Sequence, residues 1–258
     1  MTIKGYIKHQ IYRLLGPDYW AMEKTAQSPE QTSPIVYRCP SHGLKYVGNQ
    51  QLDMSNIQAK YEEVENGNEF ESSGMIMLNR AIGNHFLDLF STIVNVGCGI
   101  GTLENCHALN FPEKTFYSID YDKESIDWCK ENRPFTNVKY RNATMKDLIA
   151  ENRTFDVAMS IDVIEHLADY KSFLDEISQL SSAAIISTPN RERYNTWEHI
   201  VRPEYIYHVQ EFNPGELFFI LKMYYKTVDM YTLNYQNGEL EEIGLYSKQP
   251  NIVAYCRK

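Results

Sequence analysis

A glycine-rich turn at the end of an apolar run constrains this chain more than any other feature. Residues 93–96 read Ile-Val-Asn-Val, which is typical of a buried strand, and Gly97, Gly99 and Gly101 follow at alternate positions. Because glycine lacks a Cβ, the chain can turn sharply there and a ligand can lie against bare backbone. The helix-like segment that begins at Thr102 offers free N–H groups and a positive dipole end to an anionic group. The sequence therefore predicts a ligand-binding strand–turn–helix unit.

An acidic residue follows at the spacing that a nucleoside ligand needs. A second apolar run, residues 115–119, ends in Asp120, 19 residues beyond Gly101. An acid that closes the next strand can accept hydrogen bonds from ribose hydroxyls. Dinucleotide-binding turns favour G-x-G-x-x-G, whereas the spacing here is G-x-G-x-G. Loop and acid together predict a nucleoside-containing ligand at the top of a parallel α/β sheet, and the spacing argues against a dinucleotide.

Strand-like and helix-like segments alternate from about residue 73 onward, which predicts a parallel sheet with helices between its strands. The predicted strands cover 93–97, 115–120, 137–141, 155–160 and 183–188, and the predicted helices between them cover 101–110, 123–132, 145–151 and 166–179. Asn213-Pro214-Gly215-Glu216 has the residues of a helix start. Two further strand-like runs, at 226–235 and 251–256, complete a predicted seven-stranded, doubly wound α/β domain over residues 73–258.

Residues 1–72 do not fit that alternation and are predicted to form an N-terminal extension. Apolar residues recur at helical spacing over residues 1–15, so this segment can pack on its own domain or lie on a membrane surface. Residues 35–52 can form a short hairpin. Cys39 and His42 could be half of a zinc knuckle, but no second pair lies nearby, and a turn with one buried thiol is the preferred interpretation.

Composition excludes several classes of protein. The formal net charge of −9 argues against a general binder of nucleic acid. No apolar run approaches the roughly 18 residues of a membrane span, and no signal peptide is visible. The five cysteines are odd in number and irregularly spaced, which favours a reducing, cytoplasmic location over a disulfide framework.

Two later motifs sharpen the interpretation. The fourth predicted strand runs into Ser160-Ile-Asp-Val-Ile-Glu-His-Leu167, and Thr188-Pro-Asn190 is followed by His208-x-x-Glu-Phe212 before a helix. With the glycine loop and Asp120, these motifs resemble the class I S-adenosylmethionine-dependent methyltransferases, in the style of the O-methyltransferases of quinone and polysaccharide pathways. The resemblance covers roughly residues 75–225. It implies a Rossmann-like fold and S-adenosylmethionine as the cofactor.

The resemblance also implies roles for individual residues at the cofactor. Gly97, Cys98, Gly99 and Gly101 would hold the methionine end, Asp120 the ribose and Tyr121 the adenine, while Ser160 and Asp162 would line the methionine half. Thr144 stands where relatives usually carry an acid that meets the adenine, so Met145 and backbone groups are expected to contribute there.

An insert at about residues 189–212 follows the fifth strand and should cover the acceptor, because ligands of open α/β sheets lie beyond the carboxyl ends of the strands. Its aromatics can stack on a ring or sugar and its arginines can bind phosphate or carboxylate. The predicted acceptor-binding residues are Asn190, Arg191, Tyr194, Trp197, Tyr207 and Glu211. We expect O-methylation of a carbohydrate or cell-surface glycan precursor, with a small phenol next.

A hydroxyl acceptor must lose its proton as the new bond forms, and a neutral imidazole suits that role. His208 is the first candidate base, His166 the second and His199 the third, although each could instead brace the structure. Glu165 and His166 are adjacent, so on a helix they should point about 100° apart. No metal-ligand spacing is visible, which favours metal-free transfer. Rival functions are N-methylation, which needs less base assistance, and a non-catalytic cofactor-binding subunit.

Overall fold

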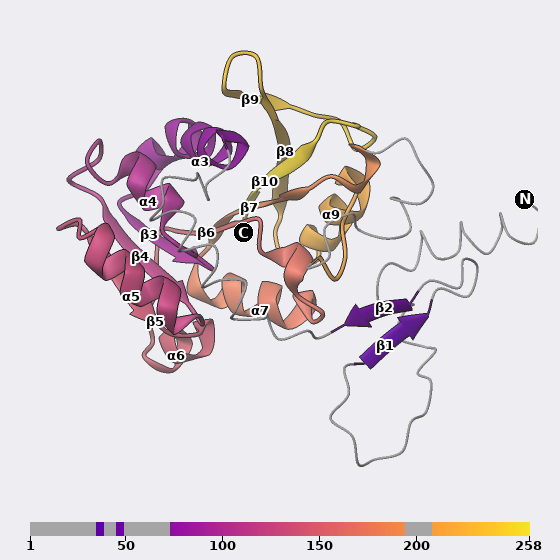
Figure 1. Ribbon diagram of the computed structural model, residues 1–258. Coiled ribbons are helices and arrows are strands. Elements are labelled where there is room, and N and C mark those ends of the chain that lie inside the picture. The colour runs from indigo at the N-terminus through magenta and orange to yellow at the C-terminus, as the bar shows by residue number, and fades with distance from the viewer. Residues whose placement is uncertain (1–34, 39–44, 49–72, 194–207) are drawn as a thin grey trace, which may run out of the picture.

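The computed structural model describes residues 35–38, 45–48, 73–193 and 208–258 (Figure 1). The predicted helix at residues 1–15, the Cys39–His42 turn and most of the predicted insert lie outside these ranges. Within the described ranges, no helix is both long enough and apolar enough to cross a membrane.

Eight strands form one mixed sheet. Their spatial order is β5 (Val138–Asn142), β4 (Thr115–Asp120), β3 (Thr92–Val96), β6 (Val157–Ile161), β7 (Ala183–Pro189), β10 (Asn251–Arg257), β8 (Thr227–Asn234) and β9 (Glu239–Glu242). The first five strands run parallel, β10 is antiparallel to both β7 and β8, and β9 is antiparallel to β8. The seven predicted strands are all present. The eighth, β9, reads Glu-Leu-Glu-Glu and sits at the sheet edge, so it carried no apolar signal.

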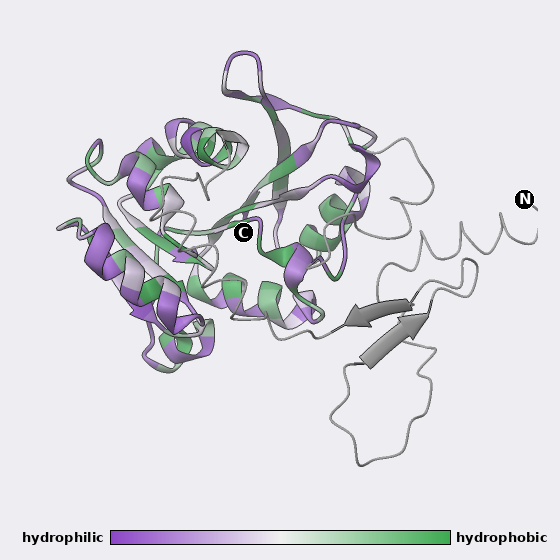
Figure 2. Ribbon diagram, in the orientation of Figure 1, coloured by the Kyte–Doolittle hydropathy of each residue, from purple (hydrophilic) through white to green (hydrophobic). Residues whose placement is uncertain are grey.

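Helices cover both faces of this sheet, as the doubly wound prediction requires. They are α3 (Ser73–Phe86), α4 (Thr102–His107), α5 (Lys123–Asn132), α6 (Met145–Ala150), α7 (Tyr170–Leu180) and α9 (Pro214–Leu221). One apolar core joins α3 and α4 to the sheet, and a second joins α6, α7 and α9 to it. Figure 2 shows hydrophobic residues along the central strands and hydrophilic ones on the outer side of α5.

The predicted helix 166–179 divides into two elements. Residues Ile164–His166 form a single 3-10 turn, η3, and α7 begins only at Tyr170. The helix starts there because the Asp169 side chain accepts a hydrogen bond from the Ser172 N–H at 3.1 Å, which caps the first turn. The segment between β6 and α7 is therefore a loop beyond the carboxyl ends of the parallel strands, where it can contribute to a site.

The strand order reverses between β3 and β6. From β3 the chain adds β4 and β5 on one side, and then crosses to place β6 and β7 on the other side. In open parallel sheets the loops beyond the carboxyl ends of the strands separate at such a switch point and leave a ligand crevice. The glycine loop follows β3 and residues 162–166 follow β6, so both predicted motifs meet at this crevice.

A separate antiparallel pair lies within the extension. Strand β1 (Ile35–Arg38) pairs with β2 (Lys45–Gly48), with Ile35 opposite Gly48. Both strands fall inside the range 35–52 in which a short hairpin is predicted.

The start of β3 is held by a side chain that we expect to contribute to stability. Asp156 Oδ2 accepts hydrogen bonds from the backbone N–H groups of Thr92 at 2.8 Å and Ser91 at 2.9 Å, and these lower the pKa of Asp156. Since Asp156 is solvent-exposed, we expect Asp156→Asn to reduce the free energy of unfolding by only about 1 kcal/mol at pH 7. Urea denaturation measures this difference.

The same measurement has a pH signature. A lowered folded-state pKa stabilises the protein above the unfolded-state value of about 4, and this contribution disappears as the pH falls through the folded-state pKa. The wild type and Asp156→Asn should therefore converge at acidic pH, whereas Asp175→Asn, an exposed control on α7, should match the wild type throughout. Equal stability of Asp156→Asn and the wild type at pH 7 would contradict the role of these bonds.

Candidate functional site at the switch point

The loop after β3 packs directly against the loop after β6. Gly97 has φ +74°, a conformation that favours glycine, and its N–H donates to the Ile119 carbonyl at 2.9 Å. A Cβ at Gly97 would lie 2.6 Å from Cγ2 of Val163. Any other residue would therefore be strained here and would also push the two loops apart. Glycine at this position keeps the two halves of the site in contact.

Gly99 faces open space instead of protein. Its φ is +52°, and a Cβ there would meet nothing within 4 Å among the atoms that the structure describes. The Gly99 N–H donates to Asp120 Oδ2 at 2.9 Å, which ties the loop to the end of β4. Beside it, Cys98 is buried, and Gly101 is the residue before the first turn of α4. The loop thus forms a bare-backbone cradle of the kind that the sequence predicts.

Asp120 ends β4 with its carboxylate at the base of this cradle. Oδ1 accepts a hydrogen bond from the Asp122 N–H at 2.9 Å, and Asp122 itself caps α5. Burial raises the pKa of Asp120, while the N–H groups of Asp122 and Gly99 act in the opposite direction. A carboxylate has about four acceptor positions, so it can also accept bonds from a ligand diol. Tyr121 follows and is 63% exposed, as a residue that flanks a ligand ring can be.

At the end of β5, the two residues expected near the adenine also have structural roles. The Thr144 hydroxyl donates to Asp147 at 2.8 Å and accepts from the Asp147 N–H, so it caps α6, and Met145 is buried in the core. The Asn142 side chain reaches the end of β4, where its amide donates to the carbonyls of Asp120 and Tyr121. Asn142 was not among the predicted residues, although its position as the last residue of β5 was a signal for it.

Past β6, the predicted residues are partly structural. Ser160 is fully buried within the strand, and Asp162 takes φ +54°. The Ser187 hydroxyl donates to Asp162 Oδ1 at 2.7 Å and joins the ends of β6 and β7. Burial raises the pKa of Asp162, and this hydrogen bond opposes the rise.

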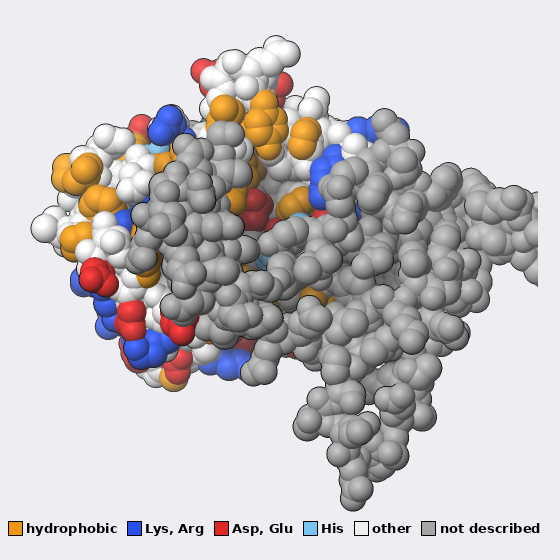
Figure 3. Space-filling view, viewed as in Figure 1, with side chains coloured by type: hydrophobic (Ala, Val, Ile, Leu, Met, Phe, Trp, Pro, Cys, Tyr) orange, Lys and Arg blue, Asp and Glu red, His pale blue; other side chains and the backbone are white. Residues whose placement is uncertain are grey.

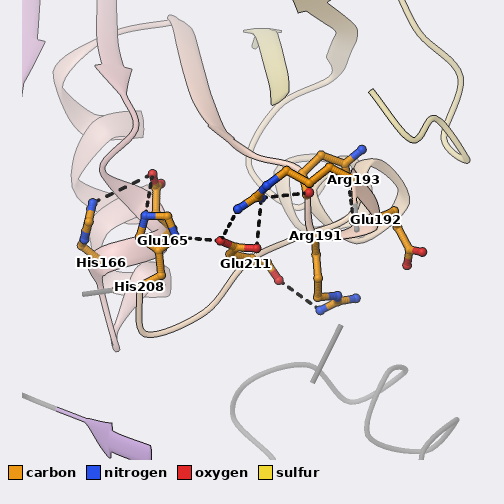
Figure 4. A network of polar contacts seen from close by, with 8 residues as sticks. Glu165, His166, Arg191, Glu192, Arg193, His208 and Glu211 are labelled. Carbon is orange, nitrogen blue, oxygen red and sulfur yellow. Dashed lines mark hydrogen bonds and ion pairs between the residues drawn. The ribbon is translucent and has the colours of Figure 1, made fainter. Parts of the chain in front are cut away.

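The side chains of Glu165, His166 and His208 converge at the segment after β6 (Figure 4). Nε2 of His166 and Nε2 of His208 each lie 4.0 Å from Oε1 of Glu165, and the two imidazole rings meet edge to face at 4.9 Å. The expectation that Glu165 and His166 point apart was made for an α-helix, whereas the chain forms a single 3-10 turn here, and the tips of the two side chains lie 4.0 Å apart. His166 and His208 are 42 residues apart in the sequence, so their spacing gave no indication that they form a cluster.

A backbone anchor holds His208 beside this turn. The N–H groups of Val209 and Gln210 donate to the Glu165 carbonyl at 2.8 and 3.1 Å, and the Gln210 amide donates to the Leu167 carbonyl at 2.8 Å. Glu165 is fully buried, and its burial, together with the nearby Asp162 carboxylate, raises its pKa well above the usual range, while the Thr188 hydroxyl acts in the opposite direction.

Glu211 connects His208 to an arginine. Its Oε1 lies 2.7 Å from His208 Nδ1 and 2.9 Å from Arg193, which also contacts Oε2 at 3.1 Å. Burial alone would raise the pKa of Glu211, but the His208 and Arg193 hydrogen bonds hold it below its ordinary range. The carboxylate therefore stays charged at neutral pH and fixes the orientation of the His208 ring.

Other predicted acceptor residues have partners within the protein. Arg191 pairs with Glu216 and donates to the Glu211 carbonyl at 3.0 Å. The Asn190 amide donates to the carbonyls of Ser247 and Gln249 at 2.9 and 2.8 Å. These contacts join the start of the predicted insert to its end and to the loop before β10. Three predicted residues and one candidate base lie outside the described ranges, namely Tyr194, Trp197, Tyr207 and His199.

In the space-filling view, acidic and histidine side chains reach the surface near the centre of the face that carries the crevice (Figure 3). The Gly97–Val163 contact places the bare-backbone cradle next to the segment that carries Glu165 and His166. The arrangement suits a ligand with a nucleoside part at Asp120 and a reactive part that points toward the histidine cluster.

Comparisons with known proteins identify a methyltransferase domain in this part of the chain. Residues 94–182 match the family described as "Methyltransferase domain". The ubiquinone biosynthesis O-methyltransferase of Bartonella tribocorum is 28% identical over 120 residues, which is 44% of this chain and 47% of that protein. The mitochondrial ubiquinone biosynthesis O-methyltransferase of Arabidopsis thaliana is 30% identical over 44% of this chain and 37% of that protein. This chain spans about half the length, or less, of these curated relatives.

A solved structure shares the fold over a longer stretch. The plantazolicin methyltransferase BpumL, in complex with a monoazolic desmethylPZN analogue and S-adenosylhomocysteine, has a TM-score of 0.57 at 15% identity over 79% of this chain and 91% of its own. The site fits the corresponding donor, S-adenosylmethionine: the cradle at Gly99 is open and the buried Asp120 carboxylate can accept ribose hydroxyls.

We expect Asp120→Ala to weaken the binding of S-adenosylhomocysteine by tenfold or more, because each hydrogen bond to a charged group contributes about 1.5–3 kcal/mol. Titration calorimetry measures the dissociation constant. Asp127→Ala, which removes an exposed carboxylate on α5, is the matched control and should bind as the wild type does. An unchanged constant in Asp120→Ala, with its circular dichroism intact, would reject the ribose role.

Proposed function

We propose that this chain, whose residues 94–182 lie in a class I S-adenosylmethionine-dependent methyltransferase domain, transfers a methyl group to a hydroxyl oxygen. The observation that carries the proposal is the contact between Gly97 and Val163. It joins the cofactor cradle to a cluster of imidazole and carboxylate groups, so a donor and an activated acceptor can meet there.

S-adenosylmethionine supplies a methyl group on a sulfonium, which departs as a neutral thioether. The acceptor oxygen forms its bond to the methyl carbon as the carbon–sulfur bond breaks, and that electron pair stays on sulfur. The main task of the protein is to align the acceptor oxygen, methyl carbon and sulfur at near-attack distance. In this proposal Asp120 and the Gly99 backbone hold the donor, and the loop after β6 lies beside the reacting groups.

The hydroxyl proton must leave during this step, and we assign the assisting role to His208. Its Nδ1 faces Glu211 at 2.7 Å, and since that carboxylate is charged, the hydrogen on the ring belongs on Nδ1. The lone pair is then on Nε2, which points toward Glu165 and His166. This arrangement of an imidazole oriented by a buried acid is a general means of activating a hydroxyl group.

A phenolic hydroxyl is our first candidate for the acceptor, and a carbohydrate hydroxyl is the second. Several of the curated relatives are named as ubiquinone biosynthesis O-methyltransferases, which favours an aromatic acceptor. The carbohydrate hypothesis depended on arginines that could bind the phosphate of a sugar nucleotide. Arg191 and Arg193 instead form ion pairs with Glu216 and Glu211. The aromatic residues of the segment 194–207 still support stacking on either ring type.

Incubation with methyl-labelled cofactor and a panel of catechols, phenols, amines and nucleotide sugars tests the acceptor class. We expect label on a hydroxyl oxygen, with catechols and phenols labelled in preference to nucleotide sugars. Label on amines alone would contradict O-methylation, and label on nucleotide sugars alone would replace the phenolic assignment with the carbohydrate one. No label on any acceptor, with normal binding of S-adenosylhomocysteine, would count against an enzyme.

Replacement of His208 tests the activation step. We expect His208→Ala to lower kcat by roughly 10²-fold or more while the affinity for S-adenosylhomocysteine stays within twofold (about 0.4 kcal/mol), since this side chain acts on the acceptor. His85→Ala, which removes an exposed imidazole on α3, should retain wild-type kcat. Single-turnover rates measure both. A normal rate in His208→Ala would leave His208 with a structural role alone.

A further inference from the structure

The carboxylate of Glu165 is buried without a compensating partner. The side chain is 0% exposed. Among the residues that the structure describes, neither Oε1 nor Oε2 has a donor in good hydrogen-bond geometry, and the Thr188 hydroxyl, which opposes the rise in the Glu165 pKa, carries no charge that would offset a carboxylate. An ionised carboxylate in such a place is strongly unfavourable unless a positive charge offsets it. The two arginines in this network, Arg193 and Arg191, pair with Glu211 and Glu216 instead.

The spacing around Glu165 is that of ligands around an ion. The Nε2 atoms of His166 and His208 each lie 4.0 Å from Glu165 Oε1, beyond the range of a hydrogen bond. All three ligand atoms lie within 4.8 Å of one another. Two metal–ligand bonds of about 2.1 Å each, meeting at one ion, place their donor atoms about 3–4 Å apart. Small side-chain rotations would therefore bring all three donors onto a single cation.

The contact between Glu211 and Nδ1 of His208 favours Nε2 of His208 as a metal ligand. A metal-binding histidine commonly donates its other ring N–H to a carboxylate, which fixes the tautomer and makes the ligating nitrogen more basic. Glu211 takes that position at Nδ1 of His208, and Arg193 holds Glu211 from its other side. The backbone bonds from Val209 and Gln210 to the Glu165 carbonyl hold the two ligand-bearing segments together.

We infer that Glu165, His166 and His208 form a binding site for one divalent cation of the class that prefers mixed nitrogen and oxygen ligands, such as Mn²⁺, Co²⁺ or Zn²⁺. Three protein ligands leave coordination positions open, as in catalytic metal sites. An acceptor hydroxyl bound at such a position would become more acidic and lose its proton to solvent, and a vicinal diol could occupy two positions.

This inference rests on the proposed function and specifies how His208 assists it. The Nε2 lone pairs of His166 and His208 hold the cation, and the cation polarises the acceptor oxygen. It also replaces the expectation of metal-free transfer, which rested on the absence of a ligand spacing in the sequence.

Direct metal binding to the full chain tests the site independently of activity. Chelator-treated protein is titrated with Mn²⁺ and followed by electron paramagnetic resonance, and Co²⁺ is followed by its visible absorption. We expect one ion per chain in the wild type and in His85→Ala. We expect loss of stoichiometric binding in Glu165→Gln, His166→Ala and His208→Ala, and about 10–100-fold weaker binding in Glu211→Gln.

Folding and cofactor binding are measured on the same samples. His166 has a partly exposed side chain, so His166→Ala carries the test even if Glu165→Gln fails to fold. Binding of neither Mn²⁺ nor Co²⁺ to the wild type, or unchanged stoichiometry in both histidine variants, would overturn the site. Methyl transfer by metal-free protein would then leave the proposed function in place. Failure to bind S-adenosylhomocysteine would instead remove the proposed function, whatever the metal result.

Discussion

The close contact between Gly97 and Val163 is the constraint on which the rest of the site depends. A parallel sheet whose order reverses between β3 and β6 necessarily brings two loops together at the carboxyl ends of these strands. How near they come is set by the residue at position 97, because even a methyl group there would lie 2.6 Å from the Val163 side chain. The same position requires φ +74°. Geometry and space therefore both demand glycine, and the cradle lies against the loop after β6 as a result.

A second constraint acts on the other side of that loop. Glu165 is buried at the point where β6, η3 and the segment before α9 meet, and its backbone carbonyl accepts two N–H groups from residues 209 and 210. The chain therefore places a carboxylate, two imidazoles and the Glu211–Arg193 pair in one compact network. Such a network is weak evidence for stability, because buried charges are unfavourable to desolvate. Because the network lies beside the cofactor cradle, we attribute it to a role in the reaction.

The sequence was sufficient for seven of the eight strands of the large sheet because their signals are local. Apolar runs and glycine spacing identified seven strands, and Asn213 with Glu216 identified the start of α9 through its capping pattern. β9 was missed because an edge strand of sequence Glu-Leu-Glu-Glu has no apolar face. The start of α7 was placed too early, because the apolar residues around 164 continue the helical spacing across a break that only the Asp169 cap defines.

The site was harder to predict because its contacts are long-range. Gly99 and Asp120 could be named from spacing alone, whereas the meeting of His166 with His208 depends on how the chain returns after β7. The intramolecular partners of Asn190 and Arg191 explain why polar residues in a predicted lid need not bind a ligand. Thr144 shows the same limit, because a residue aligned with a ligand-binding position can serve as a helix cap.

A crystal structure of the chain with S-adenosylhomocysteine and Mn²⁺ bound, with anomalous data at the manganese edge, tests the central claim most directly. The account predicts the ribose against Asp120, the sulfur near the Gly97–Val163 contact, and one anomalous peak between Glu165, His166 and His208. A nucleoside bound away from Asp120 would contradict the cofactor site. A nucleoside at Asp120 with no anomalous peak at the cluster would contradict the metal site alone.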